Sequence, residues 1–175
     1  MSSAATWAKQ PIAGVSPNQE RILEAVCPTV GATGIGQTLG GLFDSIDLKI
    51  NGVKLSYLLF CLPLAPVALT VYLLQKVLGN QYVLTNRSVE IRKIIGRILL
   101  EKVTLADIDT VNVVVRAGQA FYRAGDLDLV NARGEIMMRL AGVPWPERLR
   151  KAILETRDAR RQSDASLARI DARKG

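Results

Sequence analysis

The sequence predicts a mainly β domain with a C-terminal α-helix, preceded by one or two hydrophobic membrane segments. Three features of the 175-residue chain support this. An uncharged stretch of membrane-spanning length lies before the middle of the chain, and short segments of alternating apolar residues follow it. After Gly142 the apolar spacing becomes helical. The length suits one small domain with its own core.

The composition narrows the classes of function. The chain carries 23 Lys and Arg against 16 Asp and Glu, a net charge of +7, which favours a polyanionic partner such as an anionic bilayer or nucleic acid. It has no histidine, which excludes histidine-based catalytic triads and histidine metal sites. Cys27 and Cys61 lie in apolar stretches and form no disulfide framework. We therefore expect no enzyme, no cofactor and no metal site.

The N-terminal region, residues 1–54, contains a first uncharged stretch at 25–43. Five of its 19 residues are glycine, which is unfavourable for a membrane helix. Gly36 and Gly40 nevertheless match the spacing that lets membrane helices approach closely, so a helical hairpin bending within 44–54 is an alternative. The stretch is thus a candidate for the first of two membrane segments.

The strongest single signal is the second uncharged stretch, from Leu55 to Gln75. Its 21 residues would span roughly 30 Å as a helix, the thickness of a hydrocarbon core. Pro63 and Pro66 would end a helix in water, whereas membrane helices tolerate them. We predict a transmembrane helix over 55–78, with a buried core helix as the competing interpretation.

The distribution of charge predicts the orientation. Up to Lys54 there are four basic and four acidic residues, while from Lys76 onward 19 basic residues accompany 12 acidic ones. Basic residues beside a membrane segment favour the cytoplasmic side. The part of the chain after Lys76 is therefore predicted to be cytoplasmic, and its positive charge would attract anionic lipids.

From Gln81 onward, alternating apolar residues predict strands separated by turn residues. The six expected strands are Gln81 to Asn86, Val89 to Lys93, Arg97 to Leu105, Thr110 to Arg116, Asp126 to Asn131 and Glu135 to Leu140. Their spacing predicts an antiparallel barrel or sandwich. Alternation with Leu127 and Leu129 places Asp126 and Asp128 on a solvent-facing side, which argues against a pair of catalytic carboxylates.

A helix is predicted to close the domain. Pro146 suits the first helical turn, Glu147 suits the positive N-terminal end, and apolar residues follow at helical spacing up to Thr156. From Arg157 the composition becomes charged and small. We expect the chain to continue from there as a frayed helix into a charged, disordered tail over 158–175.

Several short motifs occur together in order. They are Tyr82-Val-Leu-Thr-Asn-Arg87, Val103-x-Leu105-x-Asp107-Ile108, Gly125-Asp126 and Gly142-Val-Pro144, after a membrane segment and before an amphipathic helix. Over residues 81–157 the chain thereby resembles the bacterial pleckstrin-homology-like (PH-like) domain family of small membrane proteins. The resemblance implies a partly open antiparallel barrel of about seven strands, capped by the helix. It also implies a position on the cytoplasmic face of the bacterial inner membrane. Relatives commonly carry two clear membrane helices, whereas 25–43 is a weak first one.

The resemblance brings no catalytic residues. It favours a membrane-anchored interaction or scaffold domain that binds itself or another membrane protein, in contact with membrane lipids. An alternative is recognition of anionic lipid headgroups by a basic hairpin tip, in which Arg92, Lys93 and Arg97 surround Ile94 and Ile95. Nucleic-acid binding is disfavoured because no recognition motif is present and few aromatic residues lie near cations.

Overall fold

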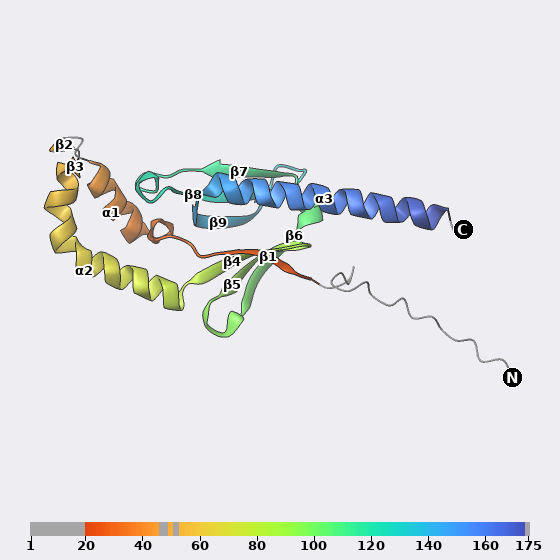
Figure 1. Cartoon of the computed structure of the whole chain (residues 1–175), viewed down its shortest axis with the longest axis horizontal. Helices are drawn as coiled ribbons and strands as arrows, with labels where there is room; N and C mark the ends of the chain where they lie inside the picture. The colour runs from red at the N-terminus through yellow and green to blue at the C-terminus, as the bar shows by residue number, and fades with distance from the viewer. Residues whose placement is uncertain (1–19, 46–48, 51–52, 174–175) are drawn as a thin grey trace.

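The computed structural model describes residues 20–45, 49–50 and 53–173 of the chain (Figure 1). Its strands are β1 (Ile22–Val26), β2 (Lys49–Ile50), β3 (Val53–Lys54), β4 (Asn80–Thr85), β5 (Ser88–Lys93), β6 (Leu99–Thr104), β7 (Thr110–Val114), β8 (Ala124–Val130) and β9 (Ile136–Pro144). Its α-helices are α1 (Gly34–Asp44), α2 (Leu55–Leu78) and α3 (Pro146–Ala172). The prediction of a mainly β domain with a C-terminal helix is confirmed, and the arrangement is consistent with a PH-like fold.

Two antiparallel sheets form the body of the domain. One has the strand order β1-β4-β5-β6 and the other the order β7-β8-β9. Strands β4 to β9 correspond to the six strands predicted from the alternating pattern, with their ends shifted slightly. The buried residues Leu84, Val89, Val111, Leu127 and Leu140 all belong to one hydrophobic core. The core therefore contains side chains from both sheets, as expected of a sandwich.

Strand β1 was not predicted. It pairs antiparallel with β4, so that Ala25 lies opposite Val83 and Val26 opposite Tyr82. The sheet therefore includes a strand from the N-terminal region, outside the expected domain of 81–157. The chain leaves the sheet after β1, forms α1 and α2, and returns to the same edge as β4 (Figure 1). The two helices are thus an insertion between neighbouring strands.

Two helices pack against each other between β1 and β4, and the first is much shorter than the membrane segment considered at 25–43. α1 and α2 contact each other and are joined through 45–54, where the bend was expected. The stretch 25–43 is divided between β1, a short turn of helix and α1, whose 11 residues extend about 16 Å, half of a hydrocarbon core. A first membrane segment at 25–43 therefore finds no support.

Helix α2 covers the predicted range 55–78 without interruption. Across the part of the chain that the structure describes, no helix is long and apolar enough to cross a membrane. The side chains of 55–64 lie outside that part. The transmembrane span consequently stays a prediction.

The glycines of α1 allow close packing within the domain. A Cβ atom on Gly40 would lie 2.2 Å from the carbonyl oxygen of Gly118, and one on Gly118 would lie 2.0 Å from the carbonyl oxygen of Gln37. Only hydrogen fits at these positions. The spacing of Gly36 and Gly40 therefore does mark a close approach of backbones, but the partner of Gly40 is the loop between β7 and β8.

Helix α3 begins at Pro146, as predicted, and its buried Leu149 and Ile153 belong to the core. It continues through Ala172. The expectation of a disordered tail over 158–175 was therefore wrong for the described residues. Good helix formers are frequent in this segment, and charged pairs such as Arg160 with Asp164 (3.1 Å) support the exposed turns.

Candidate functional site

The hairpin between β5 and β6 forms the predicted basic tip. The backbone N–H of Lys93 donates to the carbonyl oxygen of Ile98 (2.8 Å), which closes the loop. Gly96 and Arg97 both have positive φ angles, 77° and 49°. Glycine adopts this conformation freely, whereas arginine does so at some cost, so the loop has a tight, defined shape.

The three predicted headgroup residues do not form one group. Lys93 and Arg97 are exposed at the tip. The Nε of Arg92 instead donates to the carboxylate of Glu90 (2.6 Å), and the same two side chains form an ion pair. Glu90 is 1% exposed, so Arg92 neutralises a buried charge. Two of the three cations are therefore free to meet a ligand.

The tip carries more exposed apolar surface than expected. Ile94 is half-buried, and its N–H donates to the carbonyl oxygen of Gly79 (3.2 Å). Four large apolar side chains are roughly half exposed: Ile95 (57%), Ile98 (57%), Leu99 (50%) and Leu100 (48%). Sequence reasoning missed the last three. The run from Ile94 to Leu100 was the available signal, because only Gly96 and Arg97 interrupt its apolar residues.

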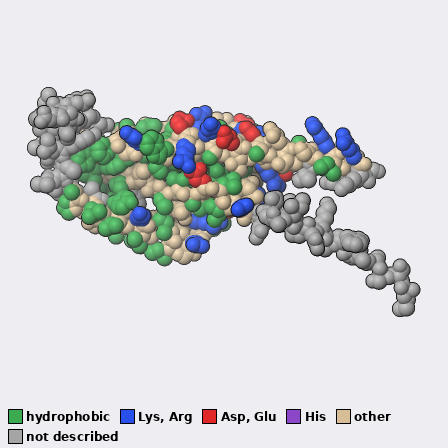
Figure 2. All heavy atoms as spheres, viewed as in Figure 1, with side chains coloured by type: hydrophobic (Ala, Val, Ile, Leu, Met, Phe, Trp, Pro, Cys, Tyr) green, Lys and Arg blue, Asp and Glu red, His purple; other side chains and the backbone are tan. Residues whose placement is uncertain are grey.

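The C-terminal half of α2 reaches the same end of the domain. The hydrogen bond from Ile94 to Gly79 places the tip beside the residue that follows α2. Large apolar side chains are exposed along this half of the helix: Val67, Leu69, Leu73, Leu74, Val77 and Leu78. Figure 2 shows apolar side chains gathered over this end, with charged side chains more frequent along α3. The tip and α2 thus form one apolar end with Lys76, Lys93 and Arg97 on it.

A charged network stabilises the sheet behind the tip. The Nζ of Lys102 on β6 lies 3.0 Å from Glu90 and 2.8 Å from Glu20. The hydroxyl of Ser88 lies 2.6 Å from the carboxylate of Glu20 and 3.2 Å from that of Glu90, so its one proton can be donated to either. The hydrogen bond from Lys102 lowers the pKa of Glu20 to about 2. This network fixes residue 20, which precedes β1, to β5 and β6.

The expectation that Asp126 and Asp128 face solvent was wrong. They are 2% and 5% exposed, because every residue of β8 is buried. Asp126 accepts hydrogen bonds from Gln119 (2.7 Å) and the backbone of Gly142 (2.9 Å), and pairs with Arg116. Asp128 pairs with Arg139 on β9. Both carboxylates are satisfied internally and serve the fold.

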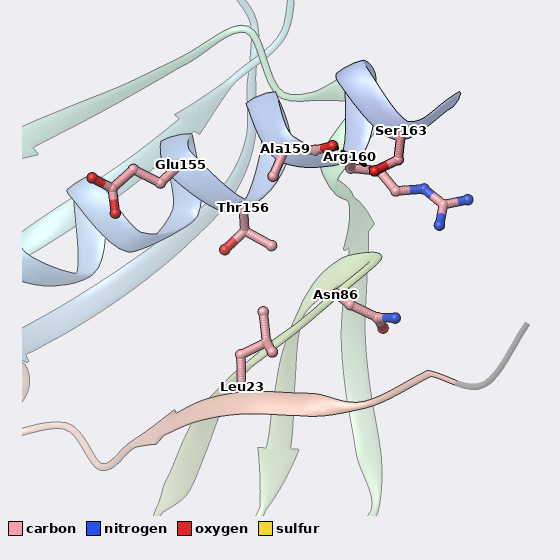
Figure 3. A pocket seen from close by; sticks show the side chains of 7 residues that line it. All are labelled: Leu23, Asn86, Glu155, Thr156, Ala159, Arg160 and Ser163. Atoms are coloured by element: carbon pink, nitrogen blue, oxygen red, sulfur yellow. Dashed lines mark hydrogen bonds between the residues drawn. The ribbon is translucent and has the colours of Figure 1, made fainter. Parts of the chain in front are cut away.

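A groove lies at the opposite end of the sandwich. It encloses about 460 Å³ and is lined by Leu23, Asn86, Glu155, Thr156, Ala159, Arg160 and Ser163. In Figure 3, Leu23 points from β1 toward Thr156 on α3, and Asn86 lies at the β4–β5 turn. Because β5 starts at this turn and ends at the basic tip, the groove and the tip lie at different ends of β5.

The described residues contain no group of three or more Cys, Asp or Glu side chains arranged to bind a metal ion. The apolar end with its cations and the groove between β1 and α3 are two surface features of the domain that could bind a partner. Comparison with protein-family models, curated proteins and solved structures finds no match to the chain.

Proposed function

We propose that this chain is a membrane-anchored PH-like interaction domain, held by α2 at the cytoplasmic face of a bacterial inner membrane. In this proposal it binds a second copy of itself or another membrane protein. The mainly β architecture with its closing helix and the ordered motifs of 81–157 support the family assignment. No enzymatic step is part of this function.

A single observation carries the proposal. The apolar side chains of α2 are exposed in its C-terminal half, and this surface continues onto the β5–β6 tip. Leu69 and Leu78 are 58% and 64% exposed, which is costly in water, and a contiguous apolar surface indicates an interaction site for a membrane or protein. The uncharged run of 21 residues from Leu55 to Gln75 favours insertion into the membrane, and because β1 and β4 pair in one sheet, the α1–α2 hairpin would enter and leave the bilayer on the same face.

The orientation follows from the same arrangement. Lys76, Lys93 and Arg97 lie on the apolar end and would meet lipid headgroups on the cytoplasmic side. The groove between β1 and α3 would then point away from the bilayer. We assign the protein partner to that groove because it is hollowed and remains accessible when the apolar end is covered.

The anchoring test changes exposed residues, so that the core stays intact. Val67→Arg together with Leu69→Arg should release the chain from carbonate-washed membranes, because each arginine near the middle of a bilayer costs about 2.5 to 3.5 kcal/mol. Ile136→Arg is the matched control, since Ile136 is 52% exposed on β9 and away from α2. Recovery of the unaltered chain in the soluble fraction would contradict the proposal.

Headgroup contact by the tip is the second candidate function. The exposed apolar residues at 95 and 98–100, next to Lys93 and Arg97, favour it. An environment-sensitive dye at Leu99→Cys, in a chain with Cys27→Ser and Cys61→Ser, should shift its emission to the blue in vesicles rich in acidic lipid. Lys93→Gln with Arg97→Gln should weaken the shift, while Arg133→Gln at a distant turn should not. Equal shifts in neutral and acidic vesicles would exclude recognition of the headgroup charge.

A further inference from the structure

A cavity of about 530 Å³ lies between α2 and the segment that connects β1 to α1. Its lining residues are Cys27, Pro28, Thr29, Val30, Tyr72, Lys76 and Tyr122. Pro28, Val30 and the two tyrosine rings make most of this surface apolar. The volume falls within the roughly 300 to 1,000 Å³ of sites that bind small molecules.

The wall of the cavity opposite α2 is tied to the sandwich. The backbone N–H and the hydroxyl of Thr29 both donate to the carbonyl oxygen of Gly142, at 2.8 and 3.0 Å. A Cβ atom on Gly31 would lie 3.2 Å from the ring of Tyr122, so that ring packs closely against the connecting segment. These contacts fix the wall before any ligand arrives, which favours a preformed site.

The polar groups of the cavity are few and include one positive charge. The Nζ of Lys76 donates to the hydroxyl of Tyr72 (3.4 Å) and lies 5.6 Å from the centre of its ring. Within the described part of the chain, no carboxylate lies at ion-pair distance from Lys76. Burial raises the pKa of Tyr122, so its hydroxyl stays neutral. The cavity thus offers apolar walls and one ammonium group.

We propose that this cavity binds one anionic phospholipid, with the headgroup phosphate at Lys76 and an acyl chain against the apolar wall and α2. The inference rests on the proposed function, because α2 would bring bilayer lipid to the cavity. Two observations select this occupant. The ammonium of Lys76 complements an anionic headgroup, and the apolar surface of the cavity continues onto the exposed side chains of α2.

Cys27 provides a direct readout, since it is exposed and lines the cavity. In the full-length chain with Cys61→Ser, solubilised in a neutral detergent, dioleoyl phosphatidylglycerol should slow maleimide labelling of Cys27. At about ten times the Kd the labelling rate should fall about tenfold. Dioleoyl phosphatidylcholine, which has the same chains and no net charge, should leave the rate near that in detergent alone.

Variants of Lys76 test the headgroup contact. Lys76→Gln should abolish the protection and Lys76→Arg should retain it, while Lys151→Gln, on the exposed side of α3, should behave as the parent. Equal protection by both lipids, protection that survives Lys76→Gln, or protection by oleate alone would overturn the proposal. The carbonate wash tests anchoring separately. If the chain stays anchored but Cys27 gains no protection, only the proposed lipid site is contradicted. If the chain is released but Cys27 is still protected, only the proposed anchor is contradicted.

Discussion

The two long helices of this molecule have opposite surfaces. α2 has 24 residues and α3 has 27, and both extend away from the sandwich (Figure 1). α2 exposes leucine and valine side chains as far as Leu78, whereas the projecting half of α3 exposes arginine, aspartate, serine and glutamine together with Ile170. A helix with apolar side chains all round is stable in apolar surroundings, and one with polar side chains all round is stable in water. The two ends of the molecule therefore suit different surroundings.

The two helices also differ in how the sandwich holds them. The first half of α3 buries Leu149 and Ile153 in the core, while the described large apolar residues in the second half of α2 remain largely exposed. α3 is therefore part of the folding unit. α2 is attached through the hairpin with α1 and through the chain that continues into β4.

Truncating a buried side chain of α3 and an exposed one of α2 tests this difference in packing. Ile153→Ala should lower the free energy of unfolding by about 2 to 5 kcal/mol, because it leaves a cavity at a fully buried position of α3. Leu69→Ala on α2 should change it by less than about 0.5 kcal/mol. Denaturant unfolding of the full chain in a mild detergent, followed by circular dichroism, measures both. Similar losses would mean that α2 packs as a core helix, the interpretation that competes with a membrane span.

The close contact between α1 and the β7–β8 loop attaches the helical hairpin to the sandwich and can be tested by substitution. Gly40→Ala should destabilise the domain by about 1 to 3 kcal/mol, because its Cβ would lie 2.2 Å from the Gly118 carbonyl oxygen. Gly41→Ala is the matched control in the same helix. Its Cβ would meet nothing within 4 Å, and alanine should stabilise the helix by up to about 1 kcal/mol. Thermal unfolding of the two variants compares them. If neither substitution changed the stability, the close contact between the backbones of α1 and the β7–β8 loop would be contradicted.

Much of the fold was predictable because its signals are local. The alternation of apolar residues from 81 to 140 located β4 to β9, and Pro146 marked the start of α3. Strand β1 was missed because its partner β4 lies more than fifty residues away in the sequence, as the pairing of Ala25 with Val83 shows. Its five residues also carry only a weak alternating pattern.

The site was less predictable, because burial depends on neighbours in space. Alternation placed Asp126 on a solvent-facing side, but α3 and the segment after β1 contact β8. Arg116 neutralises the carboxylate of Asp126, and the amide of Gln119 donates a hydrogen bond to it. The pairing of Arg92 with Glu90 had a local signal, since residues two apart share one face of a strand. The accessible cations at the tip could therefore have been reduced to Lys93 and Arg97 from the sequence.

The stability of the sandwich should depend on pH through Glu20. Residues 55–75 of α2 include no carboxylate and should not contribute to this dependence. The hydrogen bond from Lys102 lowers the pKa of Glu20 from 4.5 to about 2. A carboxyl group whose pKa is depressed on folding stabilises the protein above its unfolded pKa and loses that effect as the pH falls through the folded value. Because Glu20 is one-third exposed, we expect a loss of only about 1 kcal/mol between pH 4.5 and pH 2. Glu20→Gln should remove this part of the acid-unfolding profile, and Glu155→Gln should leave it. A profile unchanged by Glu20→Gln would contradict the contact with Lys102.

A surface ion pair in the projecting half of α3 should contribute little to stability. Arg160 and Asp164 are 3.1 Å apart, one helical turn from each other, and both are accessible to solvent. Such a pair contributes only about 0.3 to 0.5 kcal/mol, so Asp164→Asn, which removes the charge and keeps a similar helix propensity, should lower Tm by about 1 °C in a chain of this length. Asp164→Glu keeps the charge and should be closer to the parent. Calorimetry with and without added salt checks the size and the electrostatic origin of the change. A loss of many degrees would show that this half of α3 is docked in a structural contact. A change near 1 °C agrees with a helix that is stable in water through its own polar surface, a property that α2 lacks.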